Sequence, residues 1–311
     1  MIATQELRRW RYYFIDLPLW AYGIRTTSVE KRLFSFFKPE IPSFRDGIIT
    51  LCNYLGRSAT ESEIEDIIQK AFRVKIVRES DAYTCLRMSK KRFSMYFDPK
   101  GIEHLLAARE TRRPIVLLTG HFGSFYSAEV AFSLLNVVVH PIVRIVDYSP
   151  VTPLARSLYE EINYRFTEFR SPVRYIYTDF SGKIDRSVLD IMNCGGTLLV
   201  CIDLPHRLYP YKHLPVTLFG QPATLPAGLI QWAVKKGALF LTAWNSVEFS
   251  DDRKFYRFLT VEPIPDSTDV TTVMQTYADR LTDRVSKQPW QWMGLPIITQ
   301  YGENGGDGKN V

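Results

Sequence analysis

The sequence lacks any long apolar run, and this absence excludes a membrane-spanning helix. A helix that crosses a bilayer needs about 20 consecutive, mostly apolar residues, and no such stretch occurs. Segment 7–24 comes nearest, but Asp16 and Pro18 interrupt it and no small-residue cleavage site follows. It therefore does not resemble a signal peptide either.

Cysteine is also scarce, and the motifs of several enzyme classes are missing. The four cysteines show no CxxC spacing, so we expect small core residues in a reducing compartment. The absence of GxxxxGK[ST] and GxGxxG argues against a bound nucleotide, and the absence of GxSxG against a serine nucleophile. Asp203, His206 and His213 lie in one proline-rich loop but lack a known metal-ligand spacing, so no metal is expected.

The composition that remains is that of a globular protein with an excess of positive charge. Hydrophobic residues make up 46% and charged residues 23%, and the net charge is +6. This charge favours an anionic membrane surface, although it also serves solubility. Nucleic acid is not expected, because no RNA- or DNA-binding motif occurs.

The N-terminal segment combines cations with aromatic rings, as a segment lying among lipid headgroups does. Arg8, Arg9 and Arg11 stand beside Trp10, Tyr12, Tyr13, Phe14 and Trp20. The alternative is an aromatic arm that packs on the body of the protein.

The central and C-terminal sequence predicts an α/β fold. Thr60 and Glu63 have capping-box spacing before a helix whose apolar face contains Ile64, Ile67, Ile68 and Phe72. From Pro114, short apolar strands at 115–119, 141–146, 174–177, 197–202, 238–243 and 255–261 alternate with helices at 124–136, 152–166, 184–193 and 225–236, and a helix at 269–287 follows them. We therefore predict a three-layer α/β/α sandwich with a mainly parallel central sheet and a helical N-terminal region. The predicted organisation is a basic-aromatic, membrane-proximal arm at 1–40, a single domain at 41–300 and a disordered tail at 301–311.

His121 is the main candidate for chemistry. It lies between the strand at 115–119 and a helix, in the segment Gly120-His-Phe-Gly-Ser-Phe-Tyr126. Ligands of parallel sheets bind beyond the carboxyl ends of strands, where the positive end of the next helix favours a neutral imidazole. Such an imidazole can act as a general base, and nearby amides can bind an oxyanion. The alternative is a structural histidine.

The same segment resembles the active-site motif of the lysophospholipid acyltransferase superfamily, in its lipid A late acyltransferase branch. Segments 195–203, 215–228 and 289–293 are similar to further family blocks in the same order. The resemblance implies a thioester donor on the phosphopantetheine arm of a carrier protein, with no bound cofactor. It also implies lipid A or a related glycolipid as acceptor, and a peripheral location on the cytoplasmic side of the bacterial inner membrane.

One position departs from the family motif. Tyr126 occupies the position of the family's acid, and the nearest downstream carboxylate is Glu129. Because Glu129 lies too far along the helix to reach His121 directly, we hypothesise a cluster of His121, Tyr126 and Glu129. Glu129 would act through Tyr126 or on a substrate amine. The alternative is a solvated helix face.

Five further residues are candidates for substrate binding. Gly123 and Ser124 belong to the motif, and Arg144 interrupts an apolar strand where the family has a basic residue. Asp203 matches a family acid at a strand end and could orient a substrate or cap a turn. Arg207 could contact lipid phosphates.

These observations leave three functions open. The first is fatty acyl transfer from acyl-carrier protein to a lipid hydroxyl. The second is transfer of an aminoacyl group such as glycine from a carrier protein to lipid A, for which Glu129 would bind the donor ammonium. The third is lipid binding without catalysis.

Overall fold

A computed structural model describes residues 7–8, 11–21, 25–87, 95–144, 176–178, 186–209, 212–250 and 255–302. Within these ranges the core of the fold is a seven-stranded sheet in the order β1-β9-β8-β2-β5-β3-β4. Neighbouring strands are parallel except for β8 and β9, which are antiparallel. The strands are β1 (Phe97–Lys100), β2 (Ile115–Thr119), β3 (His140–Arg144), β4 (Ile176–Thr178), β5 (Thr197–Cys201), β8 (Leu239–Phe249) and β9 (Phe255–Pro263).

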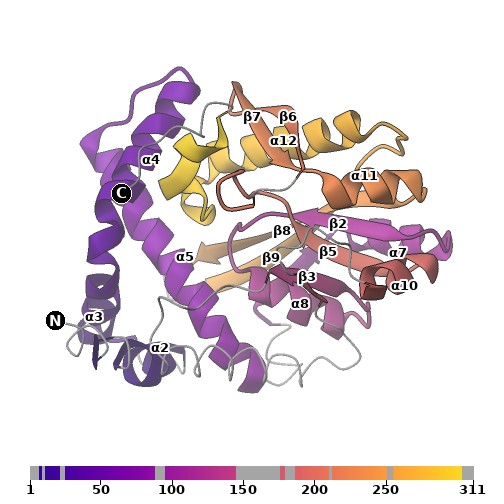
Figure 1. The fold of residues 1–311 in the computed structure, drawn as a ribbon. Helices are drawn as coiled ribbons and strands as arrows, with labels where there is room; N and C mark the ends of the chain where they lie inside the picture. Colours follow the sequence, from indigo (N-terminus) through magenta and orange to yellow (C-terminus); the bar gives the residue numbers. More distant parts are fainter. Residues whose placement is uncertain are drawn as a thin grey trace.

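Helices cover both faces of the sheet, so the predicted three-layer fold is confirmed. Alternate residues of β2 face opposite sides: Val116 and Leu118 join one hydrophobic cluster, and Ile115 and Leu117 join the other. The first cluster includes residues of α10 (Arg186–Asn193), α11 (Gly228–Lys235) and α12 (Val270–Lys287), and the second includes residues of α7 (Ile102–Glu110) and α8 (Phe125–Leu134). Every residue of β2 is buried, as expected for a central parallel strand. Figure 1 shows α11 and α12 above the sheet and α8 below it.

The N-terminal region is helical, as predicted, and stands along one side of the sheet (Figure 1). The Thr60 Oγ accepts a hydrogen bond from the Glu63 backbone N–H at 3.2 Å, which confirms the predicted cap. The apolar face predicted for this helix is buried. The elements are η1 (Tyr12–Asp16), α2 (Leu17–Ala21), α3 (Thr27–Phe37), η2 (Lys38–Glu40), α4 (Ile41–Tyr54) and α5 (Glu61–Arg87).

Two aromatic side chains of the N-terminal arm pack on the body of the protein. Tyr12 and Trp20 are buried, and Trp20 stacks on Phe255 with ring centroids 5.3 Å apart. The arm's cations differ, since Arg8 and Arg11 are exposed. Arg9, Trp10 and the Phe14 side chain lie outside the described residues. No helix among the described residues is long and apolar enough to cross a membrane.

Several elements differ from the sequence prediction. The strands β1, β6 (His213–Leu218) and β7 (Gln221–Pro226) were not predicted, and β6 and β7 form a separate antiparallel hairpin. Leu225 and Pro226 end β7 rather than beginning α11. Tyr301 is buried at the end of η4 (Leu295–Tyr301), after η3 (Pro289–Gln291), so it belongs to the body and not to a tail. The helix predicted at 152–166 and residues 303–311 lie outside the described residues.

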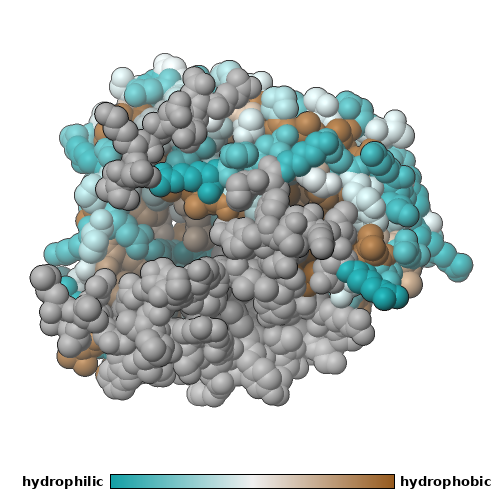
Figure 2. Space-filling model, viewed as in Figure 1, coloured by the Kyte–Doolittle hydropathy of each residue, from teal (hydrophilic) through white to brown (hydrophobic). Residues whose placement is uncertain are grey.

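The outer surface of the upper helical layer mixes hydrophilic and hydrophobic residues (Figure 2). This pattern fits α12, whose buried side chains recur at helical spacing while Thr271, Thr272, Asp279, Asp283 and Lys287 are exposed. The buried residues of α12 are Val273, Met274, Tyr277, Ala278, Leu281 and Val285.

Candidate active site

The candidate active site forms where two neighbouring parallel strands end. Thr119 of β2 pairs with Cys201 of β5 in register, and the Ile202 backbone N–H donates to the Thr119 carbonyl at 3.1 Å. The residues that follow these strands therefore meet at the carboxyl edge of the sheet. This register brings His121 to Asp203.

Two hydrogen bonds join His121 and Asp203. The His121 backbone N–H donates to Asp203 Oδ2 at 2.6 Å, and His121 Nδ1 lies 2.7 Å from Asp203 Oδ1. A carboxylate oxygen can only accept, so in the neutral ring the Nδ1 atom carries the proton and Nε2 is the basic nitrogen. The Asp203 side chain is completely buried, whereas 29% of the His121 side chain is exposed. This is the geometry of a general base whose ring is oriented by a buried acid.

Asp203 also raises the proton affinity of the imidazole. Burial alone lowers the pKa of His121 and is the largest single influence, but the charge and hydrogen bond of Asp203 together outweigh it. The positive charge of Arg78 acts in the same direction as burial. The net result is a raised pKa, which differs from the expectation that the helix end would keep this ring neutral.

Two glycines allow the strand-to-helix turn to pack closely. A Cβ at Gly120 would lie 2.9 Å from Asp203 Oδ2 and 3.0 Å from the Tyr277 hydroxyl oxygen. Gly123 has φ +61°, and a Cβ there would collide with the backbone carbonyl of Asn245. The turn therefore requires glycine at both positions for steric reasons.

The segment from Gln291 to Met293 fixes this turn from the other side. The Gly123 N–H donates to the Gln291 carbonyl at 2.7 Å, and the Met293 N–H donates to the His121 carbonyl at 2.9 Å. The Trp292 indole N–H donates to Asp203 Oδ2 at 2.9 Å. The sequence predicted no functional residue in this segment. The similarity of residues 289–293 to a family block is the signal that could have indicated one.

The structure describes the two predicted partners of His121 only in part. Tyr126 and Glu129 lie in α8, but their side chains are outside the described residues. The proposed cluster with His121 therefore stays a prediction. The described carboxylate that bonds to His121 is that of Asp203, which was expected instead to orient a substrate or cap a turn.

The other predicted binding residues lie in different environments. Ser124 is fully buried, and its hydroxyl donates to Asp81, which forms a buried ion pair with Arg257. This bond anchors the start of α8 and leaves the hydroxyl facing away from solvent. Arg207 is exposed in the loop after Asp203. Arg144 ends β3, and its side chain is outside the described residues.

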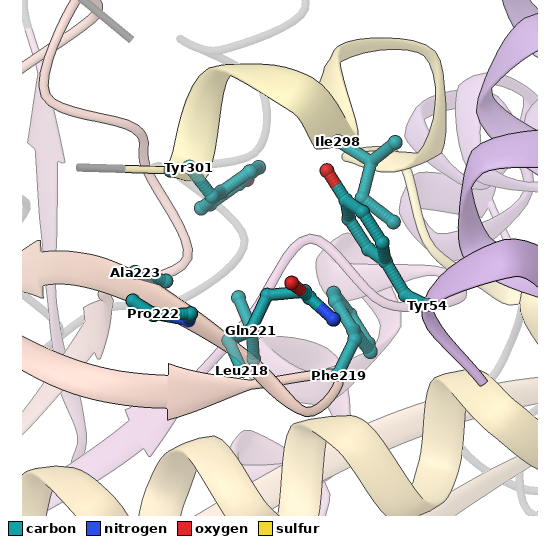
Figure 3. Close-up of a pocket in the computed structure, with 9 residues that line it drawn as sticks. Tyr54, Leu218, Phe219, Gln221, Pro222, Ala223, Ile298 and Tyr301 are labelled. Carbon is teal, nitrogen blue, oxygen red and sulfur yellow. The ribbon is translucent and has the colours of Figure 1, made fainter. Parts of the chain in front are cut away.

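A cavity of about 240 Å³ lies beside the site rather than in it. Tyr54, Tyr301 and hairpin residues between Leu218 and Ala223 line this cavity (Figure 3). Neither His121 nor Asp203 lines the cavity. The Tyr301 hydroxyl connects the two regions, because it donates to the Asp203 backbone carbonyl at 2.7 Å.

Among the described residues no three His, Cys, Asp or Glu side chains gather in a way that could hold a metal ion. The contact between His121 Nδ1 and Asp203 Oδ1 supports proton transfer by an oriented imidazole. A neutral Nε2 can remove a proton from a hydroxyl or an amine, and Asp203 stabilises the imidazolium that results.

Comparison with known protein families agrees with this geometry. The family model described as bacterial lipid A biosynthesis acyltransferase matches residues 51–296, which include both His121 and Asp203. A comparison with curated proteins gave no match. Since the matched region covers well over half of its length, the chain belongs to the bacterial lipid A biosynthesis acyltransferase family.

Proposed function

We propose that this acyltransferase moves an acyl group from a carrier-protein thioester to a hydroxyl group of lipid A or a related glycolipid. Family membership supports acyl transfer and the acceptor class. The observation that carries the mechanism is the 2.7 Å contact between His121 Nδ1 and a completely buried carboxylate oxygen of Asp203. This contact places the ring proton on Nδ1 and makes Nε2 the nitrogen that accepts a proton from the acceptor.

The proposed reaction has two steps. His121 Nε2 removes the proton of the acceptor hydroxyl while the hydroxyl oxygen attacks the thioester carbonyl carbon. The resulting oxyanion needs N–H donors, but the amides of residues 121, 122 and 123 already bond to Asp203, Gly120 and Gln291. We assign the oxyanion to the first turn of α8, where N–H groups generally have no acceptor within the helix, although that of Ser127 already bonds to the Ser124 carbonyl at 3.1 Å.

The second step releases the carrier. The tetrahedral intermediate collapses, the carbon–sulfur bond breaks, and the imidazolium returns its proton to the departing thiolate. The products are the ester of the acceptor and the free thiol of the phosphopantetheine arm. No bound cofactor is needed, because the thioester already supplies an activated acyl group.

The reaction takes place, in this proposal, at the cytoplasmic side of the bacterial inner membrane, with the protein bound peripherally. The net charge of +6 supports contact with an anionic surface, as do the exposed side chains of Arg8, Arg11 and Arg207. Arg207 lies four residues after Asp203, so a lipid phosphate bound there would be close to the site.

Intact-mass analysis of lipid A from cells with and without the protein tests the function. We expect an added mass equal to one fatty acyl group, and this mass should disappear when His121→Ala replaces the wild type. An added mass equal to an aminoacyl group would support the aminoacyl alternative, in which Glu129 binds the donor ammonium. A mass difference that persists with His121→Ala would contradict catalysis by this residue.

A further inference from the structure

We propose that Trp292 is a positioning residue of this reaction: its indole N–H orients the Asp203 carboxylate and limits how strongly that carboxylate stabilises the His121 imidazolium. The inference rests on the proposed role of His121 as general base. It gives a role in the mechanism to segment 289–293, which the proposed chemistry does not otherwise use.

Three N–H donors share the Asp203 carboxylate, and they divide its two oxygens unequally. Oδ1 accepts from His121 Nδ1 at 2.7 Å. Oδ2 accepts from the His121 backbone at 2.6 Å and from the Trp292 indole at 2.9 Å. The indole is the one side-chain donor among these that does not belong to His121 itself. It bonds to Oδ2, the oxygen that does not accept from the imidazole, so together with the His121 backbone N–H it fixes the rotation of the carboxylate.

The indole ring is itself held on all sides. Trp292 is 1% exposed, and its ring packs against Phe219 and Tyr301 at centroid distances of 5.2 and 5.5 Å. The adjacent backbone is tight as well, because a Cβ at Gly294 would collide with the indole. A ring packed in this way can hold its N–H in one direction without losing much side-chain entropy on forming the bond.

The indole N–H should reduce the extent to which Asp203 raises the pKa of His121. An N–H group brings its positive hydrogen close to the carboxylate and partly neutralises it. The imidazolium then gains less from Asp203 than it would from an otherwise unpaired carboxylate. Asp203 raises the pKa of His121 against the opposing effect of burial, and the indole moderates this rise, so that more of the histidine is in the basic form at a given pH.

Other polar groups around the pair do not replace this role. Arg78 of α5 faces His121 and lowers its pKa, in addition to the effect of burial. Cys201, Tyr277 of α12 and Tyr301 of η4 lie near Asp203, but burial, reinforced by the charge of Asp203, raises the pKa of each, so all three stay neutral. Tyr301 donates to the backbone carbonyl of Asp203, not to its carboxylate. The side chains of Tyr126 and Glu129 are outside the described residues.

Titration of the His121 ring by nuclear magnetic resonance tests the proposal without any substrate. The purified full-length protein would be compared with Trp292→Phe and with a variant carrying 3-benzothienylalanine at position 292, which keeps the indole shape but has no N–H. We expect the midpoint of the His121 titration to move to higher pH in both variants. Asp203→Asn should move it to lower pH, in the opposite direction.

Trp290→Phe is the matched control, because Trp290 lies two residues away and its ring contacts Lys70 instead of the active site. It should leave the midpoint unchanged. If Trp292→Phe does not fold, as judged by its thermal transition, the benzothienyl variant decides the question. An unchanged or lower midpoint in a folded position-292 variant would overturn the proposal.

The same variants separate this inference from the proposed function. The acid limb of the pH profile for kcat/KM should move with the titration midpoint in the position-292 variants. A wild-type protein that titrates as expected but transfers no acyl group would contradict the proposed function alone. A wild-type protein that transfers acyl groups and whose midpoint does not respond at position 292 would contradict the role of Trp292 alone.

Discussion

Replacement of Asp203 by asparagine should abolish most of the transfer activity while preserving the fold. The carboxylate accepts three hydrogen bonds, and the asparagine side chain has only one oxygen with which to replace both carboxylate oxygens. The His121 backbone and the Trp292 indole both donate an N–H to Oδ2, and neither can accept a hydrogen bond from an amide nitrogen placed there. The amide oxygen should therefore occupy the Oδ2 position, and the amide nitrogen should face His121 Nδ1.

This orientation inverts the tautomer of the imidazole. An N–H donor facing Nδ1 forces the ring proton onto Nε2, so the atom that should act as base is protonated in the neutral ring. In a serine protease, the same exchange in the catalytic triad lowers kcat about 10⁴-fold. We expect a decrease in kcat/KM of about 10³- to 10⁴-fold here, which corresponds to about 4–5.5 kcal/mol of lost transition-state stabilisation.

The assay is transfer from acyl-carrier protein to lipid A by the purified variant, quantified by product mass over a range of enzyme concentrations. Thermal unfolding must show that the variant is folded. A folded Asp203→Asn protein with activity within about tenfold of wild type would refute the pairing of Asp203 with His121 as the basis of catalysis, since tenfold is only 1.36 kcal/mol.

Three further results follow from the same contacts. Gly123→Ala should strain the turn by about 1–2 kcal/mol and force it away from Asn245, with loss of transfer. Gly237 also has a positive φ (+68°), but a Cβ there would meet no atom within 4 Å, so Gly237→Ala should keep full activity. Equal activity of the two variants would contradict the steric argument. Asp81→Ala removes the carboxylate that forms a buried ion pair with Arg257 and should lower the free energy of unfolding by about 3–5 kcal/mol. Ser124→Ala should lower it by about 1–2 kcal/mol, and urea denaturation that gave the reverse order would contradict this reasoning. The pKa of His121 is raised in the folded state, so its pairing with Asp203 stabilises the protein fully below the unfolded pKa, and this contribution is lost as pH rises through the folded pKa. The difference in unfolding free energy between wild type and Asp203→Asn should therefore shrink with rising pH. A difference that grows with pH would contradict the raised pKa.

The sequence predicts the layers of the fold well because its signals there are local. The run from Ile115 to Leu118 is apolar, and β2 occupies these four residues and Thr119. Thr60 and Glu63 lie three residues apart, so their capping contact depends on no distant part of the chain. Short segments such as 97–100 and 221–226 lack this pattern, because proline and polar residues interrupt the apolar run.

The site is less predictable because it depends on the order of strands in the sheet. His121 was identified by its position between a strand and a helix. Its partner lies 82 residues away in sequence and reaches it only because β5 is the neighbour of β2. Local spacing points instead to the helix after His121, where Tyr126 and Glu129 lie, and gives no sign that Asp203 contacts the imidazole. The contact of Trp292, a further 89 residues beyond Asp203, depends on the path of the whole C-terminal segment.

Parallel transfer assays with Asp203→Asn and Glu129→Gln distinguish which carboxylate orients His121 during acyl transfer. Both exchanges replace a carboxylate by its amide, and both proteins would receive acyl-carrier protein and lipid A under identical conditions, with intact mass as the readout. If Asp203, and not the cluster with Tyr126 and Glu129, orients His121, Asp203→Asn forms almost no acylated product and Glu129→Gln retains most of the wild-type rate. Loss of transfer in Glu129→Gln together with near-normal transfer in Asp203→Asn would contradict this role of Asp203.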